Sequence, residues 1–256
     1  MQRFVNLPLT AVILAVATLL APSNSVAEPS AFDGYDALLK AHVDDAGFVD
    51  YDALHAEPEA LRRYVDSLAD PEALPLLDQP EARLATLINA YNAFTLQLIL
   101  DNYNGDEAPQ SITDLHGGKP WDQEIWNLAG RTLSLNQLEH EIIRKQFDEP
   151  RIHWAVVCAA YSCPPLRAEA YTADRLEEQL AEQEAYVLNF NHPRYAVKQQ
   201  SGLAVTKLFE WYGQDFGPDW KAYATERLGV PLTDQIQFVS YDWKLNSKAN
   251  AASLKK

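Results

Sequence analysis

The chain has 256 residues and a formal net charge of −15, from 36 Asp and Glu against 21 Lys and Arg. This length allows one large domain or two small ones, and so acidic a surface repels phosphate, so nucleic acid is not expected as a partner. After the N-terminal segment, no stretch is long and apolar enough to cross a membrane, so no stable span is expected once that segment is removed.

The N-terminal segment has the pattern of a secretory signal. Arg3 is the only charge before Glu28, and the apolar run over 9–21 is too short for a stable membrane anchor. A small-x-small cleavage pattern ends at Ala27. We therefore expect a signal peptide over 1–27 and a periplasmic or secreted protein of a bacterial envelope, with an uncleaved N-terminal anchor as the alternative.

Hydrophobic periodicity predicts a mostly helical chain. Helices are expected over residues 31–40, 58–69, 81–100, 134–147, 173–188 and 207–215. Extended segments are expected over 152–158, 195–198, 203–205 and 236–241, with the middle two forming a hairpin. The expected fold is α+β, mostly helical around a small mixed or antiparallel sheet, as a single domain over 28–246 with a disordered tail over 247–256.

The helix expected over 81–100 is apolar around most of its circumference, which predicts a central buried helix. Asn89 and Asn92 interrupt this pattern, and Asn92 projects into the apolar stripe. A buried amide either ties up loop backbone or donates to a ligand, and both interpretations stay open.

The helix expected over 134–147 begins with a capping box, Ser134 to Gln137. Glu139 projects into the middle of its apolar stripe, whereas His140 lies at the far edge. A buried carboxylate is costly unless it is paired, so Glu139 is either a structural ion-pair partner or a functional group.

Residues 152–158 are apolar on both faces apart from His153, which is typical of a strand covered on both sides. An irregular loop with two prolines follows, and it holds Cys158 and Cys163. An exported protein with two cysteines usually pairs them, so a disulfide stands beside a free Cys158. On a strand His153 and Cys158 would face opposite sides, so they meet only if a bulge intervenes or the strand ends early; otherwise His140 is the better base.

These are the parts of a cysteine hydrolase: a thiolate, an imidazole, a carboxylate that orients it, and an oxyanion donor. The candidate catalytic residues are Cys158, His153, Glu139, His140 and Asn92. The first hypothesis is therefore a thiol-dependent hydrolase or acyl transferase, acting on amide or peptide-like envelope substrates, with a cysteine-protease-like fold as one option.

A loop-rich aromatic stretch over 102–130 supports a second hypothesis, a non-catalytic binding module with a Cys158–Cys163 disulfide. Its groove would be formed by Trp121, Trp126 and Tyr161. The residues expected to contact a peptide-like or small-molecule ligand are Asn89, Trp121, Tyr161, Ser162 and Arg167.

A third hypothesis is a metal site built from His140, His153, Glu139 and Cys158. Their spacing matches no standard zinc motif, so no metal or cofactor is expected. Thiol titration of the native protein separates the three hypotheses: free thiols favour the enzyme, a buried disulfide favours the binding module, and stoichiometric bound metal favours the third.

Several motifs in order along most of the chain closely resemble the domain of unknown function 547 family. They are Leu87-Ile88-Asn89-Ala90-Tyr91-Asn92, Leu133-Ser134-Leu135 with Leu138-Glu139-His140, His153-Trp154-Ala155-Val156-Val157-Cys158 with Ser162-Cys163-Pro164-Pro165-Leu166-Arg167, Tyr241-Asp242-Trp243-Lys244-Leu245-Asn246, and the early Gly47-Phe48-Val49-Asp50-Tyr51. The resemblance implies a compact α+β domain that bacteria often export. Eukaryotic branches of the family often carry serine where Cys163 stands here, which favours Cys158 as the functional thiol and weakens the disulfide as a family requirement.

Overall fold

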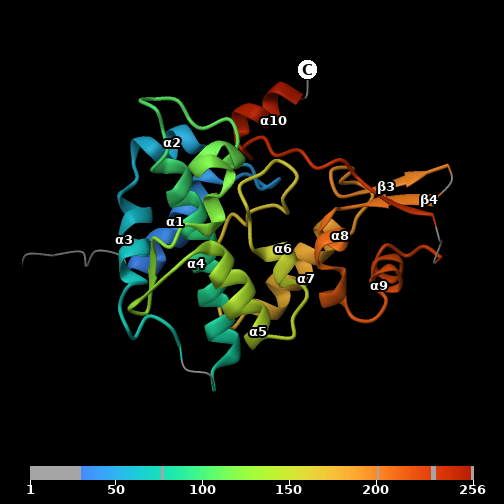
Figure 1. Cartoon of the computed structure of the whole chain (residues 1–256), viewed down its shortest axis with the longest axis horizontal. Helices are drawn as coiled ribbons and strands as arrows, with labels where there is room; N and C mark the ends of the chain where they lie inside the picture. The colour runs from blue at the N-terminus through green and yellow to red at the C-terminus, as the bar shows by residue number, and fades with distance from the viewer. Residues whose placement is uncertain (1–29, 76–77, 201, 232–234, 255–256) are drawn as a thin grey trace, which may run out of the picture.

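A computed structural model describes residues 30–75, 78–200, 202–231 and 235–254 (Figure 1). The signal peptide expected over 1–27 lies outside these residues. The fold is α+β, as expected, and consists of helices and two small sheets. The α-helices are α1 (Ala31–His42), α2 (Tyr51–Ala56), α3 (Glu59–Ser67), α4 (Pro80–Leu100), α5 (Arg144–Gln146), α6 (Ile152–Ala155), α7 (Leu176–Val187), α8 (Leu208–Tyr212), α9 (Trp220–Arg227) and α10 (Lys248–Leu254).

Helix α4 is the buried centre of the larger core, and the prediction for 81–100 is confirmed. Pro80 stands in its first turn, where its missing N–H costs no hydrogen bond, and nearly every residue from Leu84 onward is buried. Helices α2 and α3 pack against it, and α1 packs against α3, on one side of the molecule (Figure 1). Among the described residues, no helix is long and apolar enough to cross a membrane.

Both sheets are small. Strands β1 (Trp126–Leu128) and β2 (Arg131–Leu133) form an antiparallel pair. Strands β3 (Ala196–Gln199), β4 (Gly202–Val205) and β5 (Ile236–Phe238) form a mixed sheet, in which β3 and β4 make the predicted hairpin and β5 joins β4 in parallel. This mixed sheet covers a second core with α7, α8 and α9, at the other end of the molecule from α1 and α3 (Figure 1).

The prediction of a strand over 152–158 is wrong. Residues 152–155 form the short helix α6, and the chain is extended only from Val156. A short apolar run without polar alternation fits either state, and here its side chains serve two cores at once. Trp154 packs into the second core, whereas Ile152 and Ala155 pack into the first.

A disordered tail was expected over 247–256, but the described part of that segment, residues 247–254, is ordered. Its residues 248–254 form α10, and the preceding stretch is fastened to the body of the fold. The Lys248 N–H donates to the Val49 carbonyl, and the Asn246 N–H donates to the Ala159 carbonyl, both at 2.9 Å. This return of the chain places Tyr241 and Trp243 beside the loop that carries the two cysteines.

The helix predicted over 134–147 is present with one irregularity. Its Ser134–Gln137 capping box forms as expected, with the Gln137 N–H donating to Ser134 Oγ at 3.1 Å. Residues 137–143 (η3) then wind as a wider π-helical turn before α5 begins. Such turns insert an extra residue into a helix and are frequent at functional sites, and this one contains Glu139.

Candidate functional site

A cavity of about 250 Å³ lies between the two cores. Residues from α4, η3, α6, α8, the loop over 158–164 and the returning segment 241–243 line it. These six parts of the chain and Trp121 supply its side chains, so Glu139, His153, Cys158 and Trp121 of the predicted site meet in it.

Four rings form what we call the aromatic lining, namely Trp121, Trp211, Tyr241 and Trp243. The ring centroid of Trp243 lies 4.6 Å from that of Tyr241 and 5.8 Å from that of Trp121, while Trp211 and Tyr241 are 4.9 Å apart. Trp211 is 39% exposed although it is a large apolar side chain. An exposed tryptophan continuous with a cavity is a common feature of ligand sites, because its ring can cover a ligand.

His153 is 2% exposed, and its imidazole is held by a residue that the sequence did not single out, Asp215. Its Nε2 lies 2.7 Å from Asp215 Oδ2, and its ring stacks on Tyr212 with centroids 4.2 Å apart. Arg144 donates two hydrogen bonds to the same carboxylate, at 2.7 and 2.8 Å. Burial lowers the pKa of His153, partly opposed by Asp215, while His153 and Arg144 hold the pKa of Asp215 well below its usual range.

Glu139 is 6% exposed, which confirms the burial expected from its helix position. Its Oε1 lies 4.0 Å from His153 Nδ1 and 3.8 Å from His140 Nδ1. Burial raises the pKa of Glu139, against the opposing effects of His140 and of hydrogen bonds from Tyr91 and Tyr212. Burial thus favours the uncharged form of both Glu139 and His153. We call these two side chains, together with Tyr91 and Tyr212, the polar lining of the cavity.

The burial of Glu139 makes a pH-dependent prediction. Because its pKa is higher in the folded protein than in the unfolded chain, its stabilising contribution is complete below about pH 4.3 and is lost as pH rises through the folded pKa. Glu139→Gln keeps an uncharged hydrogen-bonding group at every pH. Its free energy of unfolding relative to the wild type should therefore increase as pH rises from about 4.3 through the folded pKa of Glu139.

Urea unfolding between pH 4 and 8 measures this difference, with Glu139→Leu as the comparison. The leucine variant leaves the Tyr91 and Tyr212 hydroxyls without their partner, so it should be about 1–3 kcal/mol less stable than the glutamine variant. A glutamine variant whose stability differs from that of the wild type by the same amount at every pH would show that the pKa of Glu139 is not raised in the folded protein.

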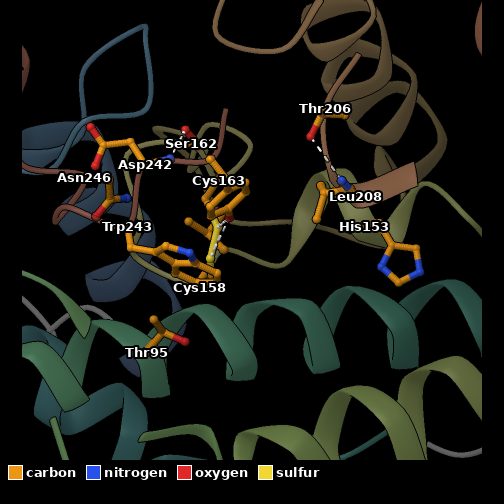
Figure 2. The surroundings of a disulfide bond; sticks show 12 residues. Thr95, His153, Cys158, Ser162, Cys163, Thr206, Leu208, Asp242, Trp243 and Asn246 are labelled. Atoms are coloured by element: carbon orange, nitrogen blue, oxygen red, sulfur yellow. Dashed lines mark hydrogen bonds between the residues drawn. A yellow bond between two sulfur atoms is a disulfide. The ribbon is translucent and has the colours of Figure 1, made fainter. Parts of the chain in front are cut away.

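The two cysteines are joined as a disulfide, with Cα atoms 6.2 Å apart (Figure 2). The hydroxyl of Tyr241 lies 3.2 Å from Cys158 Sγ and 3.4 Å from Cys163 Sγ. Figure 2 shows the His153 imidazole well away from the two sulfurs, and among the described residues no histidine hydrogen bonds to either sulfur. The expected contact between Cys158 and His153 or His140 is therefore not formed in this structure.

The buried side-chain amides of Asn89 and Asn92, both in α4, hydrogen bond to backbone groups of other segments. Asn92 Nδ2 donates to the Ala155 carbonyl at 3.0 Å, and its Oδ1 accepts from the Val157 N–H at 2.9 Å. Asn89 clamps both backbone groups of Tyr171 in the same way, at 2.8 and 2.9 Å. A buried amide could either bond to loop backbone or donate to a ligand, and the structure supports the first interpretation. Neither asparagine is among the residues that line the cavity.

The other residues expected at the ligand lie elsewhere, apart from Trp121. Trp126 is buried in the first core, stacked on Phe94 with centroids 4.9 Å apart. Tyr161 stacks on Phe48 at 5.4 Å, and Ser162 Oγ accepts from the Asp242 N–H at 2.9 Å. The groove expected from Trp121, Trp126 and Tyr161 is therefore not formed.

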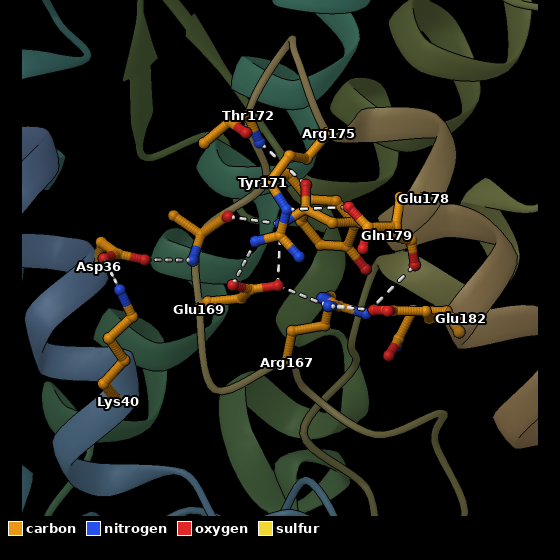
Figure 3. A network of polar contacts seen from close by, with 12 residues as sticks. Asp36, Lys40, Arg167, Glu169, Tyr171, Thr172, Arg175, Glu178, Gln179 and Glu182 are labelled. Carbon is orange, nitrogen blue, oxygen red and sulfur yellow. Dashed lines mark hydrogen bonds and ion pairs between the residues drawn. The ribbon is translucent and has the colours of Figure 1, made fainter.

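Arg167 belongs to a separate ion-pair network (Figure 3). Its Nη2 lies 2.5 Å from Glu169 and 2.7 Å from Glu182, and Arg175 pairs with Glu169 at 2.8 Å. Burial raises the pKa of Glu169, but hydrogen bonds from Arg167 and Arg175 outweigh this effect and lower the pKa to about 2. Arg167 thus fastens the segment after the prolines to α7.

The geometry supports neither the role of His140 as the base for Cys158 nor the metal hypothesis. The His140 ring lies beside Arg144, with Nδ1 3.2 Å from Nη1, and it is not among the lining residues. Within the described part of the chain, no cluster of three or more His, Cys, Asp or Glu side chains has an arrangement that could hold a metal ion.

Residues 76–187 match the family model described as "Protein of unknown function, DUF547". This segment contains α4, Glu139, His153 and both cysteines, so the match supports a DUF547 family member. Neither the comparison with curated proteins nor that with solved structures finds a match. Trp211, Tyr212, Tyr241 and Trp243, which complete the lining of the cavity, lie beyond the matched range, as does Asp215, the partner of His153.

Proposed function

For this chain with its DUF547 segment, we propose a binding module that holds an uncharged peptide-like or small-molecule ligand in the cavity between Glu139 and the disulfide. The observation that carries the proposal is the pairing of a partly exposed aromatic lining with a buried polar lining in one cavity. An apolar face of the ligand would pack on Trp211 and Trp243, and its polar group would hydrogen bond to Glu139 or His153.

The charges around the cavity support an uncharged ligand. Asp215 is neutralised by two hydrogen bonds from Arg144, and burial favours the uncharged forms of Glu139 and His153. An uncharged carboxyl donates one hydrogen bond and an uncharged imidazole has one free acceptor, which together match an amide. A charged ligand would lose its hydration here without gaining an ion pair.

The geometry favours binding over the thiol-dependent hydrolase or acyl transferase. That chemistry needs a free Cys158 thiolate with an imidazole in contact. Cys158 is instead bonded to Cys163, and its Sγ lies 3.2 Å from the Tyr241 hydroxyl. The disulfide therefore serves the proposed module as a wall of the cavity.

Trp211→Ala tests the proposal. Tryptophan fluorescence would follow titration with N-acetyl-phenylalanine amide and with its anionic counterpart, N-acetyl-phenylalanine. We expect saturable binding of the amide, weaker binding of the anion, and a loss of amide affinity of about 10-fold or more in the variant, because a stacked aromatic anchor is removed.

Phe32→Ala is the matched control, since Phe32 is similarly exposed, at 37%, but lies on α1 outside the cavity. It should bind the amide as the wild type does. Equal affinity of the wild type and Trp211→Ala, or saturable binding by neither, would contradict the proposal.

We also propose that the protein is exported, on the pattern of its first 27 residues. Protein purified from a bacterial envelope should then begin at Glu28, which N-terminal sequencing or intact mass measures. A mass that includes Met1 would contradict cleavage.

A further inference from the structure

The two cysteines of the disulfide differ in exposure. Cys163 is 4% exposed, whereas Cys158 is only partly buried, and both line the cavity. A thiolate that enters the cavity from solvent therefore meets Cys158 Sγ more readily than Cys163 Sγ. Thiol–disulfide exchange requires such access at one sulfur.

The sulfur of the less exposed cysteine, Cys163, accepts a hydrogen bond from the backbone. The Cys158 N–H donates to Cys163 Sγ with N and S 2.9 Å apart. The Tyr241 hydroxyl lies within reach of both sulfurs, 3.2 Å from Cys158 Sγ and 3.4 Å from Cys163 Sγ. Donors at a sulfur favour its thiolate over its thiol, and a thiol of lower pKa leaves faster in exchange. Cys163 is thus arranged as the leaving group and Cys158 as the sulfur under attack.

The loop over 158–163 is held without the disulfide. The Tyr161 N–H donates to the Lys244 carbonyl at 2.6 Å, and the Ser162 N–H donates to the Asp242 carbonyl at 3.1 Å. The Tyr195 hydroxyl donates to the Cys163 carbonyl at 2.9 Å. Because these bonds involve neither sulfur, the loop can keep its position when the disulfide opens.

We propose that the Cys158–Cys163 disulfide is exchange-active and oxidises an external dithiol. A thiolate of the dithiol attacks Cys158 Sγ, forming a mixed disulfide, and the bond to Cys163 breaks with its electron pair going to Cys163 Sγ. The second thiolate of the partner then attacks its own sulfur in that mixed disulfide and releases Cys158 as a thiolate. Two electrons reach the protein, the partner becomes a disulfide, and the two protons it loses go to the cysteine thiolates or to solvent.

This inference does not rest on the proposed binding function. It depends on the hydrogen bonds at Cys163 and on access to Cys158, whereas amide binding depends on Trp211 and the polar lining. Loss of one activity without the other would therefore show which proposal has failed.

Equilibration of the folded protein with mixtures of reduced and oxidised dithiothreitol tests the proposal, with the thiol content read by alkylation and mass spectrometry. We expect complete, reversible conversion while the protein stays folded. Tyr241→Phe removes a donor within reach of both sulfurs and so destabilises the reduced form. Its equilibrium constant should shift about tenfold toward the disulfide, or about 30 mV to a more negative potential.

Tyr161→Phe is the matched control, because Tyr161 lies in the same loop and its hydroxyl contacts neither sulfur among the described interactions. Its potential should equal that of the wild type. A disulfide that reacts only when the protein unfolds, or equal potentials in Tyr241→Phe and Tyr161→Phe, would overturn the proposal.

Trapping gives a second measurement. Cys163→Ser should form a stable mixed disulfide at Cys158 with Ellman's reagent in the folded state, at least tenfold faster than Cys158→Ser reacts at Cys163. Faster reaction of Cys163 in the folded protein would reverse the assigned roles and contradict the proposal.

Discussion

Gly47→Ala is expected to lower the free energy of unfolding by about 3–5 kcal/mol, from a clash with backbone and from an unfavourable φ. Gly47 has φ +78°, and a Cβ added there would overlap the backbone of Pro165 and come within 2.7 Å of the Leu166 nitrogen. Backbone cannot rotate away as a side chain can, so the contact between the two segments must open. Urea unfolding measures the loss.

Gly34→Ala is the control for this prediction. Gly34 lies within α1, and an added Cβ would meet nothing within 4 Å. Because alanine favours a helix over glycine, this variant should gain up to about 1 kcal/mol. Equal effects of the two substitutions would contradict the close packing of Gly47 on Pro165, and with it the placement of Pro164 in the cavity wall.

Asn92→Leu is expected to cost about 2–5 kcal/mol, because two buried backbone groups lose their partners. The Ala155 carbonyl and the Val157 N–H both bond to this side chain, and they lie between His153 and Cys158. The variant should therefore also weaken amide binding in the cavity. Urea unfolding and the fluorescence titration measure the two effects separately.

Two further asparagines serve as controls. Asn89→Leu should lose similar stability but keep the cavity, because its partners are the backbone groups of Tyr171. Asn127 is exposed in β1, so Asn127→Leu should stay within about 0.5 kcal/mol of the wild type. An Asn92→Leu variant as stable as Asn127→Leu would refute the role of this amide as a backbone clamp.

Local patterns predicted the parts of the fold that local physics controls. The helix over 81–100 and the burial of Glu139 followed from apolar spacing, and both are confirmed. The prediction of a strand over 152–158 failed because a short apolar segment is compatible with either a helix or a strand. Which of the two forms depends on the cores that the segment contacts. The Asn92 clamp on 155–157 could not be read from spacing, since it joins segments 63 residues apart.

The cavity shows the same limit. Glu139, His153, Trp121 and Cys158 were predicted from their own neighbourhoods, and the structure brings all four to one cavity. Asp215 was missed because it lies 62 residues from His153, in a segment whose sequence resembles an ordinary amphipathic helix. Tyr241 and Trp243 belonged to a recognised motif, but nothing local indicated that this motif would meet the sulfurs.

The indole N–H signals of the tryptophans in an ¹H–¹⁵N NMR spectrum test the binding module most directly. The chain has six tryptophans, of which Trp121, Trp211 and Trp243 line the cavity, while Trp126, Trp154 and Trp220 do not. On titration with N-acetyl-phenylalanine amide, the first three signals should shift together along one saturation curve and the other three should stay in place. Shifts confined to the second group, uniform shifts of all six, or no shift would contradict a ligand site in this cavity.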